Sequence, residues 1–261
     1  MKLPPTTFFR SVSIAWGWVI LTAIVVGSSC SNSSSTPRSL ELQANASIPE
    51  WGGLNVITRG AELDDAEWVV VMLHGFGAPA EDLVPMSRFI SPSPETCFAF
   101  PAAPIALGNG GRAWWNRGGP DMESALEKIV ALLDFVHTRN SNARIVLGGF
   151  SQGAILTSNL LGEHPQRLAA AVLLAPSGRV QRERDASVPK PHIFLAHGRS
   201  DDRLPFDGSL QLREQLLGEG FSIEWVPFDG GHTIPPMVVE ELAAFLKQLC
   251  DATADPNGSG N

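Results

Sequence analysis

The sequence of 261 residues predicts an α/β domain in which a mostly parallel central sheet is flanked by helices. Short apolar runs alternate with segments of helical periodicity for about 200 residues, which is the pattern of strand–helix–strand units. The apolar runs are rich in Val and Ile and lack polar alternation, as expected of strands that are covered on both faces. Six such runs are present: Trp68–Leu73, Cys97–Phe100, Arg144–Leu147, Ala170–Ala175, His192–Ala196 and Phe221–Val226.

Four further segments have helical periodicity. In Asp121–Thr138 the apolar side chains form one stripe, and acidic residues occupy the first turn, where they interact favourably with the helix dipole. The other three helices are expected at Gln152–Glu163, Phe206–Leu217 and Pro235–Leu249. Prolines at the start of the last segment suit a first helical turn, because the amide proton that proline lacks has no partner there.

The composition fits one globular domain and excludes several classes of protein. Apolar residues make up 44% of the chain, which is enough for a full core. The net charge is −8, from 19 basic and 27 acidic residues, so we expect no basic face and no binding of nucleic acid. The chain contains no CxxC zinc motif, P-loop, HExxH or GxGxxG, so we expect no metal and no cofactor.

Residues 1–30 have the layout of an export signal. Lys2 and Arg10 supply a positive start, and residues 14–27 form an apolar run that is short for a membrane span but typical of a signal. Small residues then lead to Cys30, which resembles the lipobox of bacterial lipoproteins, although Gly27 stands where that motif usually has Leu. Lipidation of Cys30 would anchor the chain to a membrane of a bacterial envelope. The alternatives are an uncleaved anchor, or cleavage that releases a periplasmic or secreted protein.

The remaining cysteines, Cys97 and Cys250, lie in an apolar strand and at the end of an amphipathic helix. In an oxidising compartment they could form a disulfide. The simpler interpretation is two separate buried thiols.

The sequence Gly149-Phe150-Ser151-Gln152-Gly153 reads GxSxG and lies between a predicted strand and a predicted helix. In a nucleophile elbow the chain turns sharply at this point, and glycines flank the serine because side chains there would collide. The turn exposes the serine hydroxyl at the start of a helix. Ser151 is therefore the candidate nucleophile.

A serine hydroxyl needs a base to accept its proton, and two later strand ends offer the partners. Asp201 follows the strand that begins at His192, and His232 follows the strand that ends near Val226. The chain order of serine, acid and histidine predicts His232 as general base and Asp201 as the group that orients it. Asp202 and Asp229 are the other candidates for the acid.

The strand Trp68–Leu73 runs into His74-Gly75-Phe76-Gly77. A glycine-rich loop at this place can present a free backbone N–H to an oxyanion, and the residue after the nucleophile supplies a second one. The predicted donors are the backbone N–H groups of Phe76 and Gln152. His74 is interpreted as a residue that holds this loop by hydrogen bonds, and His197 as a structural residue.

The motifs LHGFG (73–77), GFSQGA (149–154), HGxxD…P (197–205) and GGH (230–232) together resemble the phospholipase/carboxylesterase family, which includes acyl-protein thioesterases. Residues 112–116 resemble the aromatic segment of that family. The resemblance implies an α/β-hydrolase fold over a catalytic domain of residues 51–250. The composition of the flanking segments predicts a flexible linker at residues 31–50 and a loose tail at residues 251–261. The resemblance also implies hydrolysis of small-molecule or lipid carboxylic esters or thioesters without a cofactor. The export signal and the charged Asp202 and Arg203 depart from the family pattern.

The predicted site is open. Only about 15 residues separate the strand Ala170–Ala175 from Pro191, which leaves no room for a large cap domain. Apolar side chains near the predicted loop ends could line an acyl groove, and the candidates are Trp114, Trp115, Leu204, Phe206 and Ile234, beside Phe76. An open cleft would also admit a polymer, so an exported feruloyl esterase or polyester depolymerase is an alternative. A non-catalytic envelope binding protein is a further one, and the oligomeric state is left open.

Overall fold

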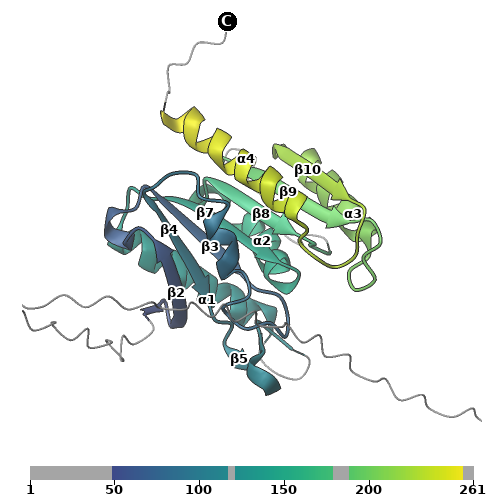
Figure 1. Ribbon diagram of the computed structural model, residues 1–261, viewed down its shortest axis with the longest axis horizontal. Coiled ribbons are helices and arrows are strands. Elements are labelled where there is room, and N and C mark those ends of the chain that lie inside the picture. Colours follow the sequence, from purple (N-terminus) through teal and green to yellow (C-terminus); the bar gives the residue numbers. More distant parts are fainter. Residues whose placement is uncertain (1–48, 117–120, 179–187, 255–261) are drawn as a thin grey trace, which may run out of the picture. The chain divides into compact units, whose positions relative to one another are not determined.

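The computed structural model describes residues 49–116, 121–178 and 188–254, and all of them belong to the compact unit that begins at Ala46. The predicted export signal, Cys30 and most of the predicted linker lie outside these residues. Within the described ranges the main sheet has eight strands in the order β1-β2-β4-β3-β7-β8-β9-β10 (Figure 1). The strands are β1 (Glu50–Trp51), β2 (Leu54–Gly60), β3 (Trp68–Leu73), β4 (Thr96–Pro101), β7 (Arg144–Phe150), β8 (Ala170–Leu174), β9 (His192–Gly198) and β10 (Ile223–Phe228).

Six neighbouring strands, from β4 through β3, β7, β8 and β9 to β10, run parallel. At the other edge β2 pairs antiparallel with β4, and β1 pairs antiparallel with β2. A separate two-stranded hairpin joins β5 (Ile105–Ala106) to β6 (Arg112–Ala113). The prediction of a mostly parallel sheet is therefore confirmed, and the described residues contain no large cap domain.

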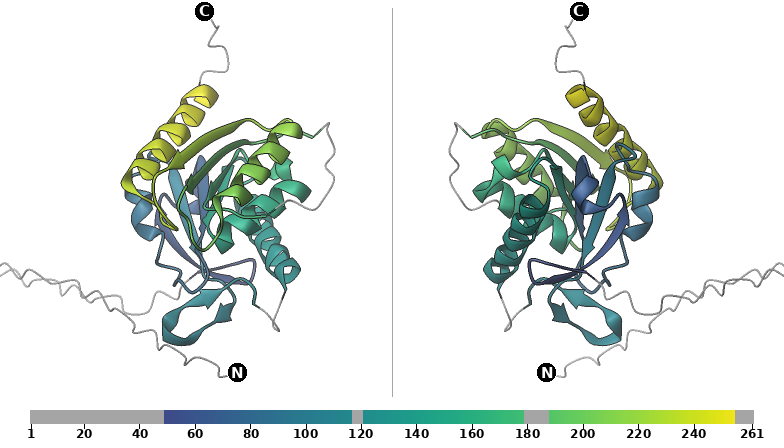
Figure 2. Two further views of the ribbon diagram at one scale, coloured as in Figure 1. Left: turned by 90° about the vertical axis from the view of Figure 1, so that its right-hand side faces the viewer. Right: turned by 90° about the vertical axis from the view of Figure 1, so that its left-hand side faces the viewer.

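Helices cover both faces of the sheet (Figure 2). The helices are α1 (Met122–Arg139), α2 (Gln152–Glu163), α3 (Phe206–Gly218) and α4 (Pro236–Ala254). Residues of α1, α2 and α3 share one apolar cluster, whereas α4 and the short 3-10 helix η2 (Val84–Arg88) contribute to the other. The start of α1 is fixed by the carboxylate of Asp121, which accepts a hydrogen bond from the N–H of Ser124 at 3.0 Å.

Strand β3 shows why the apolar runs are continuous. Val69, Val71 and Leu73 point into the cluster below α1 and α2, and the alternating residues Trp68, Val70 and Met72 point into the cluster below α4. All six side chains are buried. A polar residue at any of these positions would lose its water without gaining a partner, so both faces of the strand must be apolar.

Two parts of the fold differ from expectation. Strands β1 and β2 were not predicted, because β2 (LNVITRG) mixes apolar and polar residues and lies at an edge, where one face is partly exposed. Helix α4 continues to Ala254, so the first four residues of the predicted tail are helical.

Cys97 and Cys250 are free thiols. Cys97 belongs to the apolar cluster on the α1 side of the sheet, and Cys250 packs against the cluster on the α4 side. Burial raises the pKa of the Cys97 thiol to about 11. A disulfide between two side chains on opposite faces of one sheet would require the sheet to open, so the interpretation as separate thiols agrees with the structure.

Candidate active site

Ser151 occupies the turn between β7 and α2. Its backbone angles are φ 54° and ψ −113°, a conformation that side-chain-bearing residues rarely adopt. The flanking glycines allow the turn to close. A Cβ on Gly153 would lie 2.1 Å from the carbonyl oxygen of Leu73, and a Cβ on Gly149 would lie 2.5 Å from the backbone of Gly153. The turn therefore needs both glycines, and it holds the Ser151 hydroxyl at the carboxyl edge of the sheet.

The structure brings Ser151, His232 and Asp201 together from three separate strand ends. Ser151 Oγ lies 2.9 Å from His232 Nε2, and His232 Nδ1 lies 2.6 Å from Asp201 Oδ2. The ring of Phe150 packs against the His232 ring, with 4.7 Å between their centres. Of the three predicted candidates for the acid, Asp201 is the one in contact with His232.

The two other candidates are placed differently. The Asp229 side chain is 98% exposed and faces Arg199, and Asp202 is exposed. Exposed carboxylates would hold an imidazole weakly, because water competes for their hydrogen bonds.

The Asp201 carboxylate receives four N–H groups. Oδ1 accepts hydrogen bonds from the backbone N–H groups of Arg203 and Leu204, both at 2.9 Å. Oδ2 lies 2.6 Å from His232 Nδ1 and 3.1 Å from His197 Nε2. Burial opposes ionisation of this group, but the hydrogen bonds from Leu204, His232 and Arg203 outweigh it and hold the Asp201 pKa below its usual value. Asp201 is thus a fixed negative charge.

His197 was interpreted from the sequence as a structural residue, and its contact with Asp201 was not foreseen. Its side chain has no exposed surface, and its Nε2 lies 2.9 Å from the carbonyl oxygen of Leu204 as well as 3.1 Å from Asp201 Oδ2. Because both neighbours are acceptors, Nε2 carries the proton. Nδ1 has no hydrogen-bond partner among the described residues, and burial lowers the His197 pKa. His197 is therefore a neutral donor that lies at the same carboxylate oxygen of Asp201 as His232.

The buried histidines predict that mild acid, between pH 7 and pH 5, destabilises the fold. Burial lowers the pKa of both His74 and His197, so the unfolded chain binds protons below about pH 6.5 while the folded chain does not. The free energy of unfolding should fall from pH 7 to pH 5, by at most about 1.4 kcal/mol per pH unit for each histidine. Urea unfolding at several pH values measures this.

The matched variants are His197→Gln, which removes one of the two groups, and His137→Gln, which changes an exposed histidine on α1. We expect the free energy of unfolding to depend less strongly on pH in His197→Gln than in the wild type. In His137→Gln this dependence should equal that of the wild type. If His197→Gln keeps the full pH dependence, His197 is charged in the folded state and the assignment is wrong.

The loop after β3 lies directly beside Ser151, because a Cβ on Gly75 would be 3.5 Å from the Cβ of Ser151. The N–H of Ala103 donates to His74 Nε2 at 3.2 Å, so the proton of this ring is on Nδ1, which donates to the carbonyl oxygen of Gly75 at 2.8 Å. The N–H of Gly77 donates to the carbonyl of Arg112 at 2.8 Å. These bonds agree with the interpretation that His74 holds the loop.

The backbone N–H groups of Phe76 and Gln152 make no hydrogen bond to any described residue. Both belong to segments that border Ser151. Two backbone N–H groups without a partner beside a serine are available to a ligand oxygen.

The side chain of Gln152 has a second function that the sequence did not reveal. Its Oε1 accepts the backbone N–H of Trp114 at 2.9 Å, and its Nε2 donates to the carbonyl oxygen of Trp115 at 2.8 Å. The indole N–H of Trp114 donates to the carbonyl oxygen of His74 at 2.9 Å. Gln152 therefore ties the aromatic segment to the elbow, and Trp114 ties it to the loop after β3.

This geometry corrects one expectation. Trp114 is fully buried in the core, so it offers no surface to a substrate and supports the loop instead. Trp115, Leu204, Phe206 and Ile234 are each partly exposed, and Phe76 is 60% exposed. Phe206 packs edge-on against His197, with 5.8 Å between ring centres. Within the described residues, no group of three or more His, Cys, Asp or Glu side chains is arranged to hold a metal ion.

Comparisons with known proteins identify the family and the fold. The family model for phospholipase/carboxylesterase matches residues 55–250. The chain is 26% identical over 221 residues to acyl-protein thioesterase 1 of Eremothecium gossypii, a match that covers 75% of this chain and 94% of the relative. Among solved structures it resembles esterase PE8, with a TM-score of 0.65 and 26% identity over 75% of this chain and 99% of that one. The Bacillus cereus carboxylesterase has the same fold, with a TM-score of 0.64 and 22% identity over 75% of this chain and 94% of the other.

Proposed function

The chain belongs to the phospholipase/carboxylesterase family of α/β hydrolases, and on that premise we propose that it is a serine esterase whose nucleophile is Ser151. The family supports a hydrolase of the carboxylesterase or thioesterase type. The observation that carries the serine mechanism is the pair of contacts that links Ser151 Oγ to His232 and His232 to Asp201, at 2.9 and 2.6 Å.

The proposed reaction has two halves. His232 Nε2 accepts the hydroxyl proton as Ser151 Oγ forms a bond to the carbonyl carbon of the ester. The tetrahedral intermediate then collapses, the bond to the leaving oxygen or sulfur breaks, and His232 returns the proton to the leaving group. Water adds to the acyl-enzyme in the same way, with His232 again taking a proton, and the carboxylic acid leaves while Ser151 regains its hydrogen.

Each fixed group has a role in this scheme. The Asp201 carboxylate orients His232 and stabilises its protonated form, which exists only during the reaction. The N–H groups of Phe76 and Gln152 donate to the oxyanion of the tetrahedral intermediate. Both donors are backbone groups held by the surrounding hydrogen bonds, so little reorganisation is needed when the negative charge develops.

We propose carboxylic esters or thioesters with an apolar acyl group as substrates, in keeping with the thioesterase and carboxylesterase relatives. Phe76, Trp115, Leu204, Phe206 and Ile234 are the proposed lining of the acyl site. The two alternatives considered from the sequence, a polymer esterase and a non-catalytic binding protein, are not favoured by the matches.

We also propose that the domain is exported and held at a membrane through lipidated Cys30. The support is the positive start, the apolar run of residues 14–27 and the small residues before Cys30. No helix within the described residues is long and apolar enough to cross a membrane. A Cys30→Ser variant should move from the membrane fraction to the soluble fraction, and a wild-type chain found wholly in the soluble fraction would contradict lipidation.

Labelling with a fluorophosphonate tests the serine mechanism. The probe forms a covalent bond with an activated serine, so we expect one adduct by intact mass and a modified peptide that contains Ser151. Denatured protein is the control and should not react. A folded protein that takes up no probe, or one labelled at another serine, would contradict the proposal.

A further inference from the structure

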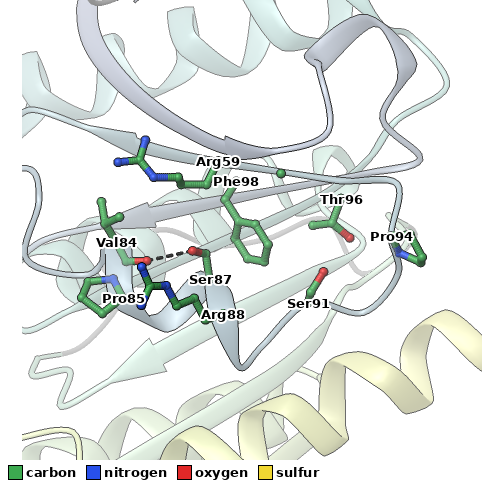
Figure 3. A pocket seen from close by; sticks show the side chains of 10 residues that line it. Arg59, Val84, Pro85, Ser87, Arg88, Ser91, Pro94, Thr96 and Phe98 are labelled. Atoms are coloured by element: carbon green, nitrogen blue, oxygen red, sulfur yellow. Dashed lines mark hydrogen bonds between the residues drawn. The ribbon is translucent and has the colours of Figure 1, made fainter. Parts of the chain in front are cut away.

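Figure 3 shows a pocket of about 460 Å³. The pocket lies at the end of the sheet opposite to the candidate active site. Arg59 of β2 pairs in register with Phe98, near the start of β4, whereas Ser151 and Asp201 follow the carboxyl ends of β7 and β9. The pocket is formed between the end of β2, the start of β4 and the short helix η2. Its lining residues are Arg59, Gly60, Val84, Pro85, Ser87, Arg88, Ser91, Pro94, Thr96 and Phe98.

The two arginines distinguish this pocket from the rest of the surface. Neither Arg59 nor Arg88 has a carboxylate partner among the described residues, and no acidic residue lines the pocket. Most other described arginines are paired: the guanidinium groups of Arg139, Arg144, Arg167, Arg199 and Arg213 lie between 2.5 and 3.5 Å from a carboxylate oxygen. In a chain of net charge −8, two unpaired guanidinium groups in one acid-free pocket form a local site of positive potential.

The guanidinium groups retain most of their donors. The one hydrogen bond from either group to a described residue runs from Arg59 Nη1 to the carbonyl oxygen of Thr58 at 2.7 Å. The Ser87 and Ser91 hydroxyls donate to backbone carbonyls at 2.8 Å, and the buried Thr96 hydroxyl does the same. A ligand in the pocket would therefore meet free N–H donors mainly from the two arginines.

The remaining lining combines the apolar side chains of Val84, Pro85 and Phe98 with the hydroxyl groups of Ser87, Ser91 and Thr96. Phe98 is buried, so Val84 and Pro85 supply most of the apolar surface. In Figure 3 both guanidinium groups lie at the end of the pocket where Val84 and Pro85 are found, and the Phe98 ring lies between them and Ser91. Arginine matches the oxygens of phosphate with its planar fork of donors, and the apolar surface of Val84 and Pro85 suits an apolar group attached to that phosphate. The volume is sufficient for both parts of such a ligand.

We propose that this pocket binds an organic phosphate, with the phosphate oxygens on Arg59 and Arg88 and the attached apolar group against Val84 and Pro85. The ligand can be a soluble phosphate ester or the head group of an anionic phospholipid, which share this chemistry. The site is separate from Ser151, so it does not depend on the proposed esterase activity.

Calorimetric titration of the full chain with phenyl phosphate and with inorganic phosphate tests the site. We expect phenyl phosphate to bind with a millimolar or lower dissociation constant and more tightly than inorganic phosphate, because only the former uses the apolar wall. The double variant Arg59→Gln/Arg88→Gln should weaken binding about 10-fold or more, since charge-assisted hydrogen bonds are lost. The double variant Arg139→Gln/Arg167→Gln is the matched control, because it removes the same charge from paired arginines outside the pocket.

Sedimentation with vesicles of phosphatidylglycerol separates the two sources. If Arg59→Gln/Arg88→Gln loses vesicle binding, the phosphate that occupies the pocket is that of a lipid head group. If the two double variants bind vesicles equally, the phosphate is that of a soluble ester. The thermal unfolding midpoint confirms that each variant is folded. Two results would overturn the proposal. The first is that phenyl phosphate does not bind at concentrations up to 10 mM, which is about the weakest dissociation constant that such a pocket should give. The second is that the two double variants weaken binding equally.

Discussion

Replacing Ser151 with alanine is expected to lower turnover of an ester substrate by at least ~10³-fold and to leave the fold intact. The hydroxyl is the atom that lies 2.9 Å from His232, and alanine removes it without changing the backbone. The residual rate would come from the oxyanion donors and from binding of the substrate. Hydrolysis of an acyl nitrophenyl ester, with circular dichroism of the same sample, measures both parts of the prediction.

Ser141→Ala is the control, because Ser141 is an exposed loop serine away from the site. Its turnover should equal that of the wild type within about 2-fold. A Ser151→Ala variant that keeps more than a tenth of the activity would remove Ser151 from the role of nucleophile.

The second large effect is expected from Asp201→Asn, which should lower turnover by about 10³- to 10⁴-fold. The carboxylate accepts two backbone N–H groups at Oδ1 and faces the N–H groups of His232 and His197 at Oδ2. An asparagine must direct its NH₂ group at one of these pairs, where donor meets donor. Either His232 turns away with the wrong tautomer, or the loop at Arg203 and Leu204 loses its hydrogen bonds.

Asp202→Asn is a close control, since it makes the same chemical change at the neighbouring, exposed residue. Turnover in that variant should change by no more than about 2-fold. Equal losses in the two variants would show that the charge of this loop matters and not the contact of Asp201 with His232.

Most strands of the sheet could be predicted because burial on both faces restricts which residues they contain. A strand that is covered on both faces must be apolar throughout, and β3 and α2 were predicted with the bounds that the structure shows. Edge strand β2 was missed because that rule does not apply to a strand with a partly exposed face. The end of β7 was predicted three residues early, because glycines at positions 148 and 149 resemble a turn although they continue the strand.

The motifs predicted which residues meet, and the supporting contacts could not be read from them. Asp201 could not be separated from Asp202 by spacing with certainty, because the choice depends on which side chain the loop turns inward. The contact of His197 with Asp201 joins residues four apart in a non-helical turn, for which no periodicity exists. Trp114 was expected to line the acyl groove because it lies near a predicted loop end, whereas its side chain is fully buried and the residue is hydrogen-bonded to His74 and Gln152.

The strand order has a consequence for how the chain folds. The central strand β3 pairs with β4 and β7, and β7 is separated from it in sequence by β4, the hairpin and the whole of α1. Pairing over such distances is slow, because the entropy of closing a long loop is lost before any contact is gained. A chain interrupted before Arg144 would lack β7, which is one neighbour of β3, and also helices α2 and α4, which contribute to the clusters on its two faces. Such nascent or clipped fragments are expected to aggregate through β3, whereas the complete chain buries all six of its side chains.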